Sequence, residues 1–130
     1  MTKVPMISII DDDESIREAT RGLVRSLGYK ADTFASAEEF LHSERVCESS
    51  CVITDVHMPG LSGVELQRLL KAQGHRTPII FLTAFPEERI RARVLRAGAI
   101  GFLTKPFREE CLIDFLDCAL SHRNDGPAEQ

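Results

Sequence analysis

The sequence has 130 residues, a length that suits one domain and leaves no room for two ordinary ones. Apolar residues make up 43% of the chain and charged residues 28%, a balance typical of a soluble globular protein. A formal net charge of −4 argues against direct contact with nucleic acid, and no apolar run approaches the length of a signal peptide or a membrane span. We therefore expect a cytoplasmic domain that contacts neither nucleic acid nor membrane.

Five short apolar runs divide the chain, and each predicts a β-strand. They are Met6–Ile10, Lys30–Phe34, Cys51–Thr54, Pro78–Leu82 and Ala99–Leu103. Apart from the weaker second run, their apolar residues are continuous rather than alternating, as in the strands of a parallel sheet that is buried on both faces. We therefore expect a parallel sheet covered by helices on both sides.

An amphipathic helical pattern follows each run. The first helix should end at Gly28, and the fourth should have Pro86 in its first turn and end at Gly98. Capping-box patterns pair Ser36 with Glu39 and Ser62 with Glu65, and the last helix should begin at about Glu109. This alternation predicts an α/β fold, a single doubly wound (βα)5 domain with a five-stranded parallel sheet. The domain should cover residues 1–122, and residues 123–130 should form a polar C-terminal tail or the start of a linker.

The cysteines and histidines show no metal-binding pattern. The cysteines are Cys47, Cys51, Cys111 and Cys118. None belongs to a Cys-x-x-Cys pair, and the four histidines are scattered, so the spacing gives a zinc site little support. We expect reduced thiols that pack as small apolar residues, with Cys111 and Cys118 on a buried stripe of the last helix.

Polar residues follow the central strands where each of them ends. Asp11 and Asp12 follow the first run, Asp55 the third, Thr83 the fourth and Lys105 the fifth. The carboxyl ends of parallel strands meet at one edge of the sheet, where α/β proteins bind ligands. Two carboxylates about 4 Å apart repel each other by about 4 kcal/mol at an effective dielectric constant near 20. Such a site requires either protonation or a divalent cation, and an all-oxygen set suits Mg²⁺.

This set of side chains also suits phosphoryl transfer. Asp55 could act as the nucleophile, giving an aspartyl phosphate. Lys105, Mg²⁺ and the Thr83 hydroxyl could each stabilise one oxygen of the transferred group. Each residue also has a purely structural interpretation, since Asp13 should cap the first helix and Thr83 could cap the fourth. Their joint placement at consecutive strand ends favours a phosphate-handling site.

The sequence resembles the receiver domain of two-component response regulators from about Val4 to Leu120. The motifs that carry the resemblance are IIDDDESIR from Ile9, TDVHMPGLSGVEL from Thr54, FLTA from Phe81 and AGAIGFLTKPF from Ala97. The DDDE and MPGLSGVEL motifs, together with SAEEFL from Ser36, are similar to the FixJ-type subfamily. The resemblance implies a flavodoxin-like strand order, 2-1-3-4-5.

The resemblance also implies roles for the residues that match the family's metal site. Asp55 matches the phosphoacceptor. Asp12 matches the direct acidic Mg²⁺ ligand, and Asp11 matches the acid that acts mainly through water. His57 matches the position whose backbone carbonyl binds the metal. Mg²⁺ is therefore the expected cofactor.

Three further positions match the family's switch. Thr83 and Lys105 match the hydroxyl and the lysine that contact the phosphoryl group, and Phe102 matches the switch aromatic, with Phe in place of the more frequent Tyr. The Lys105–Pro106 bond matches a peptide that is cis in the family. In the family, phosphorylation remodels the face of the fourth helix, fifth strand and fifth helix, through Thr83 and Phe102.

The resemblance implies partners as well. The donor would be a sensor histidine kinase or a histidine phosphotransfer protein, and the remodelled face could form a phosphorylation-dependent homodimer or contact an output domain that regulates transcription. That face includes Arg89, Arg91, Arg93 and Arg96. The simpler interpretation of these arginines is a solvated helix face, and the alternative is a partner or dimer surface.

Two departures and two alternatives remain open. His57 is large and titratable, and Phe85-Pro86 replaces a smaller, Gly-rich stretch, so phosphate lifetime and loop mobility could differ from the common pattern. One alternative is a degenerate receiver that acts only as a protein-interaction module. The other is a small Asp-dependent phosphatase of the haloacid dehalogenase type, which would require a second acid where this chain has His57.

Overall fold

The computed structural model describes residues 4–125 and contains one five-stranded sheet. The strands are β1 (Met6–Ile10), β2 (Lys30–Phe34), β3 (Cys51–Asp55), β4 (Ile79–Thr83) and β5 (Gly101–Thr104). All pair in parallel, in the order β2-β1-β3-β4-β5. The predicted fold class and strand order are therefore confirmed.

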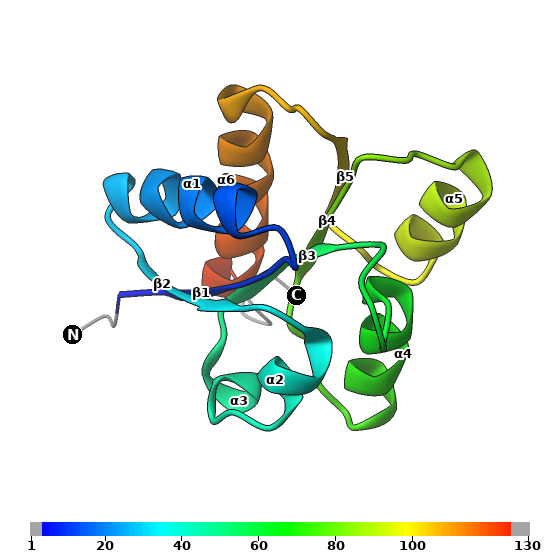
Figure 1. Cartoon of the computed structure of the whole chain (residues 1–130). Helices are drawn as coiled ribbons and strands as arrows, with labels where there is room; N and C mark the ends of the chain where they lie inside the picture. The colour runs from blue at the N-terminus through cyan, green and yellow to red at the C-terminus, as the bar shows by residue number, and fades with distance from the viewer. Residues whose placement is uncertain (1–3, 126–130) are drawn as a thin grey trace.

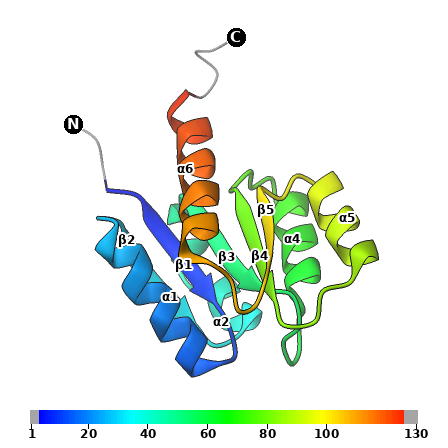
Figure 2. The ribbon, with the colours of Figure 1, turned by 90° about the horizontal axis from the view of Figure 1, so that it is seen from above.

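Helices cover both faces of the sheet (Figures 1 and 2). They are α1 (Glu14–Ser26), α2 (Ala37–Leu41), α3 (Arg45–Glu48), α4 (Gly63–Ala72), α5 (Glu88–Arg96) and α6 (Glu109–Asp125). Figure 2 shows α1 and α6 on one side of the sheet and α4 and α5 on the other. The result is a three-layer α/β/α domain.

Alternation along the strands divides the core into two clusters. On β3, Val52 joins the cluster under α2, α4 and α5, while Ile53 joins the cluster under α1 and α6. Both side chains are fully buried. On β4, Phe81 joins the first cluster and Ile80 the second, and both are also fully buried. Successive strand residues point to opposite faces, so the continuous apolar runs supply both clusters at once.

The register of the sheet brings the carboxyl ends of the central strands together. Ile10 pairs with Thr54, and Asp55 pairs with Leu82. Thr83 in turn pairs with Thr104 at the ends of β4 and β5. The residues that follow β1, β3, β4 and β5 therefore emerge at one edge of the sheet.

The observed helix N-termini agree in part with those predicted from the sequence. Asp13 is the N-cap of α1, and its side chain accepts a hydrogen bond from the Ile16 amide. Ser62 and Glu65 form a complete capping box at α4. Ser36 accepts from the Glu39 amide, but the Glu39 carboxylate reaches back to the amide of Ala35 rather than to that of Ser36, so this box is offset by one residue.

The largest differences lie around α5. This helix begins at Glu88, with Glu87 as its N-cap, so Pro86 precedes the helix and the prediction that it stands in the first turn was wrong. Thr83 likewise lies too far upstream to cap α5. The end of the helix is as predicted, since Gly98 adopts a φ of 108°. Strand boundaries shift by at most two residues, and the short helix α3 was not predicted.

The last helix extends further than the sequence indicated. α6 continues to Asp125, so residues 123–125 of the expected tail are helical, and residues 126–130 lie outside the described part. Of the four cysteines, Cys51 is buried and Cys111 is half-buried, whereas Cys47 and Cys118 are exposed. The expected core packing is therefore confirmed for Cys51 and was wrong for Cys47 and Cys118. Among residues 4–125, no helix is both long and apolar enough to cross a membrane.

Candidate functional site

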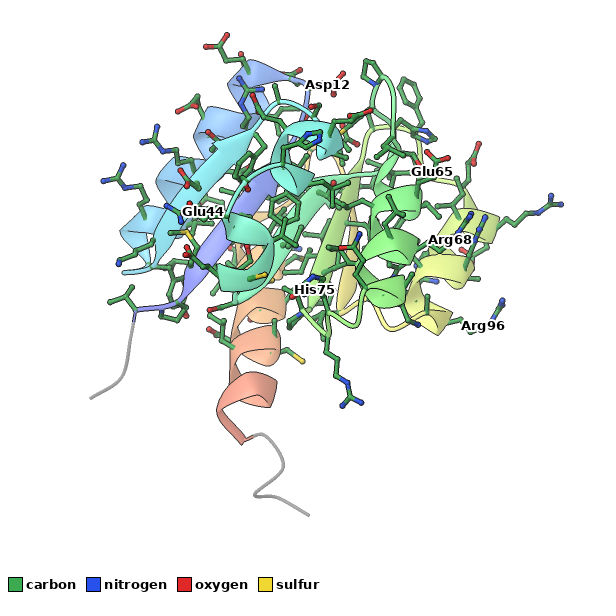
Figure 3. All side chains as sticks on the ribbon, turned by 90° about the horizontal axis from the view of Figure 1, so that it is seen from below. Asp12, Glu44, Glu65, Arg68, His75 and Arg96 are labelled. Atoms are coloured by element: carbon green, nitrogen blue, oxygen red, sulfur yellow. The ribbon has the colours of Figure 1, made fainter. Side chains whose placement is uncertain are left out.

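Three carboxylates converge at the carboxyl edge of the sheet. Asp11 follows β1 and is 1% exposed, Asp55 ends β3 and is 6% exposed, and Asp12 faces solvent. One carboxylate oxygen from each lies within 4.8 Å of the others. Figure 3 places Asp12 at the opposite end of the molecule from His75 and Arg96. Neighbouring parallel strands thus bring together acids that are 44 residues apart in sequence, since β1 pairs directly with β3.

Lys105 completes this cluster. Its ammonium nitrogen Nζ donates to Oδ2 of Asp11 at 2.9 Å and to Oδ2 of Asp55 at 3.0 Å, and its side chain is 9% exposed. The Lys105 amide donates to the Thr83 carbonyl at 2.8 Å, and the peptide bond to Pro106 is cis, as the family resemblance implied. The backbone therefore directs this lysine across the ends of β1 and β3.

The charges of the cluster do not balance. Three carboxylates face one ammonium group, which leaves two negative charges if all are ionised. Burial raises the pKa of Asp55 and Asp11 adds to that rise, although the hydrogen bond from Lys105 opposes it. Burial alone would lower the pKa of Lys105, but its hydrogen bonds to Asp11 and Asp55 raise it, so the lysine stays charged. This excess negative charge and the all-oxygen donor set fit a hard divalent cation such as Mg²⁺.

An open hollow of about 240 Å³ lies over Asp55. Its lining comprises Asp12, Asp13, Ile16, Asp55, His57, Ala84, Phe85 and Lys105. The backbone of His57 hydrogen-bonds the Asp55 carboxyl group, while the rings of His57 and Phe85 meet edge to face with centroids 6.4 Å apart. Phe85 is 72% exposed and stands at the rim. The hollow leaves room for a phosphoryl-sized group beside the Asp55 carboxylate.

Thr83 and Phe102 do not line this hollow. Thr83 is 1% exposed, and its hydroxyl oxygen accepts a hydrogen bond from the Phe85 amide at 3.0 Å. Phe102 lies on β5, is partly buried and packs against the core cluster that includes Val94 of α5. The structure thus groups Asp11, Asp12, Asp55 and Lys105. The expected switch residues Thr83 and Phe102 lie outside the lining of the hollow.

Two residues that the sequence did not single out also shape the site. The Arg17 guanidinium donates through Nη1 to the Asp11 carbonyl at 2.8 Å and so fixes the turn between β1 and α1. Gly63 packs so closely that a Cβ at this position would overlap the Asp55 carbonyl oxygen. Both residues lie in motifs that carry the family resemblance, Arg17 at the end of IIDDDESIR and Gly63 within TDVHMPGLSGVEL, and this is a signal that could have found them.

A second, largely apolar hollow of about 510 Å³ adjoins the site. It lies between α1 and the segment that follows β5, and Lys105 and Ala84 line both hollows. Ile16, Ala19 and Leu23 of α1 form one wall, and Pro106 and Phe107 form the other. An apolar surface thus borders the hollow over Asp55.

Comparison with known proteins gives one consistent family. A family model described as response regulator receiver domain matches residues 7–117. The response regulator protein TodT of Pseudomonas putida is 41% identical over 118 residues, which cover 91% of this chain and 52% of that protein. The transcriptional regulatory protein FixJ of Bradyrhizobium diazoefficiens is 34% identical over 120 residues, covering 92% and 58%. The chain thus spans about half the length of the curated relatives it matches.

Solved structures agree. The response regulator StyR superposes with a TM-score of 0.85 at 41% identity, over 92% of this chain and 60% of that chain. The FixJ-N crystal structure superposes with a TM-score of 0.82 at 28% identity, over 93% of this chain and 97% of that chain. The second comparison covers nearly all of a solved chain, so this domain corresponds to a separately crystallised fold.

Proposed function

Because the chain belongs to the response regulator receiver family of two-component signalling systems, we propose that Asp55 accepts a phosphoryl group from a phosphohistidine donor with the help of Mg²⁺. One observation carries the proposal: three carboxylates and the ammonium group of Lys105 meet beside the hollow that Asp55 lines. The residue types and their spacing leave phosphorylation at Asp55 as the chemistry that best suits this edge of the sheet.

The metal would be held by Asp11, Asp12, Asp55 and the backbone carbonyl of His57, with Asp11 acting mainly through water. When bound, Mg²⁺ supplies positive charge that offsets the carboxylates and the oxygens of the transferred group. Lys105 already touches Oδ2 of Asp55, so it stands where it can neutralise another phosphoryl oxygen. An Asp55 oxygen attacks phosphorus, and the donor imidazole leaves.

Thr83 and Phe102 would couple the modification to a distant surface. The Thr83 hydroxyl now accepts from the Phe85 amide, so it must exchange this partner to donate to a phosphoryl oxygen. Movement of Thr83 would leave space toward β5, where Phe102 is only partly buried against the core. The face formed by α5, β5 and α6 would change in response.

The same face supports a phosphorylation-dependent homodimer. Four exposed arginines lie on α5, namely Arg89, Arg91, Arg93 and Arg96. The exposed acid Asp114 lies on α6. A two-fold axis through such a face can place the basic helix of one copy against the acidic helix of the other.

We assign the apolar hollow beside the acceptor to donor docking. Ile16, Leu23 and Phe107 would receive an apolar helix of a sensor histidine kinase or histidine phosphotransfer protein, with the phosphohistidine over Asp55. Relatives named as transcriptional regulators support control of transcription as the output, through a separate region of a longer regulator. In this proposal the domain is a cytoplasmic signalling module of residues 1–122, and it assists only its own phosphorylation and dephosphorylation.

Incubation with acetyl phosphate, with and without Mg²⁺, tests the proposal. Intact mass measurement should show the gain of one phosphate only when Mg²⁺ is present, and Asp55→Asn should abolish it. Beryllofluoride provides a second test, since it should bind wild type and not the variant. Modification at another residue, or none with any donor, would instead support a module that acts through protein contacts alone.

A further inference from the structure

Glu38 links helix α2 to the loop that carries the acceptor site. Its carboxylate oxygen Oε2 accepts a hydrogen bond from the Leu61 amide at 3.0 Å, across 23 residues of sequence. That amide belongs to the segment between Asp55 and α4, which also contains His57. Glu38 itself does not line the hollow over Asp55, so it touches the site only through this loop.

The loop is shaped around this carboxylate. Gly60 adopts a φ of 77°, and a Cβ at this position would overlap Oε2 of Glu38. A side chain there would be strained by its backbone and would also displace the carboxylate. The hydrogen bond from Leu61 is the largest influence on the pKa of Glu38, which lies below its ordinary value. Backbone geometry, steric fit and charge therefore all favour the ionised Glu38 in this position.

Few other polar contacts hold the loop. Among residues 4–125, the Gly63 amide donates to the Val56 carbonyl at 2.9 Å, and the Val56 amide donates to the Leu82 carbonyl at 2.9 Å. Both bonds lie at the ends of the loop. Near the start of the loop, the backbone of His57 also hydrogen-bonds the carboxyl group of Asp55 on β3. The hydrogen bond from Leu61 ties the later part of the described loop to a side chain of helix α2.

We propose that Glu38 is a positioning residue for the metal site, which holds the loop after β3 so that the His57 carbonyl faces the cluster of Asp11, Asp12 and Asp55. The inference rests on the proposed function, since it assigns to the same site a residue outside it. The physical reason is preorganisation: a loop that is already ordered loses less conformational entropy when a ligand binds. Supporting groups of this kind commonly change metal affinity by about tenfold or more.

The chain offers a matched control on the same helix. Glu39 is adjacent and has the same charge, and its carboxylate also accepts one backbone hydrogen bond, from Ala35 at 2.7 Å. That contact lies at the start of α2 and does not involve the acceptor loop. If Glu38 matters only through the stability of α2, then Glu38→Ala and Glu39→Ala should have the same consequences.

Two measurements on the folded variants test the proposal. In the metal-free protein, the Leu61 amide should exchange its hydrogen faster in Glu38→Ala than in Glu39→Ala, because only the first loses its acceptor. Calorimetric titration with MgCl₂ should show an affinity about tenfold weaker for Glu38→Ala and unchanged for Glu39→Ala. Glu38→Gln, which keeps an acceptor oxygen, should retain most of the affinity.

Gly60→Ala provides an independent route to the same contact. As a single substitution it should weaken Mg²⁺ binding. In the double variant its effect should not add to that of Glu38→Ala, because both substitutions disrupt the same hydrogen bond between Leu61 and Glu38. Equal Mg²⁺ affinity in wild type and Glu38→Ala, with acetyl phosphate still modifying Asp55, would overturn the role of Glu38 while leaving the proposed function intact. Failure of the wild-type protein to bind Mg²⁺ or to be modified would overturn both.

Discussion

Nζ of Lys105 lies 3.0 Å from Oδ2 of Asp55, between the ends of two strands that are not neighbours in the sheet. Because β4 separates β3 from β5, the lysine must extend past the end of β4 to reach Asp55. The same ammonium group also contacts Asp11 beyond β1. One cation therefore joins three strand ends, and its removal should affect stability and chemistry together.

Replacement of Lys105 by Met should destabilise the metal-free protein by about 3 kcal/mol, because two buried carboxylates then lose their cation. Saturating Mg²⁺ should recover part of this stability by supplying positive charge and binding only the folded state. Urea unfolding of wild type and variant, with and without MgCl₂, measures both effects. Phosphorylation by acetyl phosphate should remain slow even with Mg²⁺. A variant as stable as wild type without metal would contradict this account of the cluster.

Asp55 should make the metal-free protein less stable at neutral pH. Burial raises its pKa in the folded state, so the folded protein holds this proton more tightly than the unfolded chain does. The associated stability is present below the unfolded pKa, about 3.9, and is lost as pH rises through the raised folded value. Asp55→Asn should therefore be more stable than wild type at pH 7, and the difference should shrink as pH falls toward 4. Urea unfolding across this range, without Mg²⁺, checks the sign.

The elements that position the site could be predicted from sequence for a simple physical reason. Asp55, Thr83 and Lys105 stand at or directly after apolar runs, and parallel strands end at one edge. The predicted doubly wound order then places them together. The position of each of these residues directly after an apolar run is therefore enough to place it at the carboxyl edge of the sheet.

The features that escaped prediction depend on contacts that form only in the folded protein. Arg17 and Glu38 act through hydrogen bonds to backbone groups whose position depends on the folded loops. Pro86 favours a helix start, yet α5 begins two residues later, as propensity alone does not fix a boundary. Cys118 was expected on the buried stripe of α6 but is exposed, because that stripe is formed by Leu112, Leu116, Ala119 and Leu120 on another side of the helix.

The His57 and Phe85 rings should influence how long a phosphoryl group survives on Asp55. Their edge-to-face contact stands at the rim of the hollow through which water would reach the acceptor. Phe85→Ala should widen this entrance and shorten the lifetime of the aspartyl phosphate several-fold. Loss of the phosphate after removal of acetyl phosphate, followed by intact mass, gives the rate. Phe85→Leu keeps a bulky side chain but has no aromatic ring. A wild-type lifetime in this variant would indicate that Phe85 acts by excluding water, and a short one that the contact with the His57 ring is needed. An unchanged lifetime in the alanine variant would rule out a barrier role.

Gly63 should be irreplaceable at the start of α4, although alanine is the better helix former. A Cβ at Gly63 would overlap the Asp55 carbonyl oxygen, so Gly63→Ala should cost about 1–3 kcal/mol and displace the acceptor. Gly22, inside α1, is the matched control because a Cβ there meets nothing within 4 Å, and Gly22→Ala should stabilise by about 0.5–1 kcal/mol. Urea unfolding measures both values, and acetyl phosphate labelling should fall only for Gly63→Ala. If the two Gly→Ala substitutions change the free energy of unfolding in opposite directions, the cost at Gly63 comes from the contact with Asp55. A Gly63→Ala variant more stable than wild type would show that the backbone around Asp55 can shift to accommodate a Cβ.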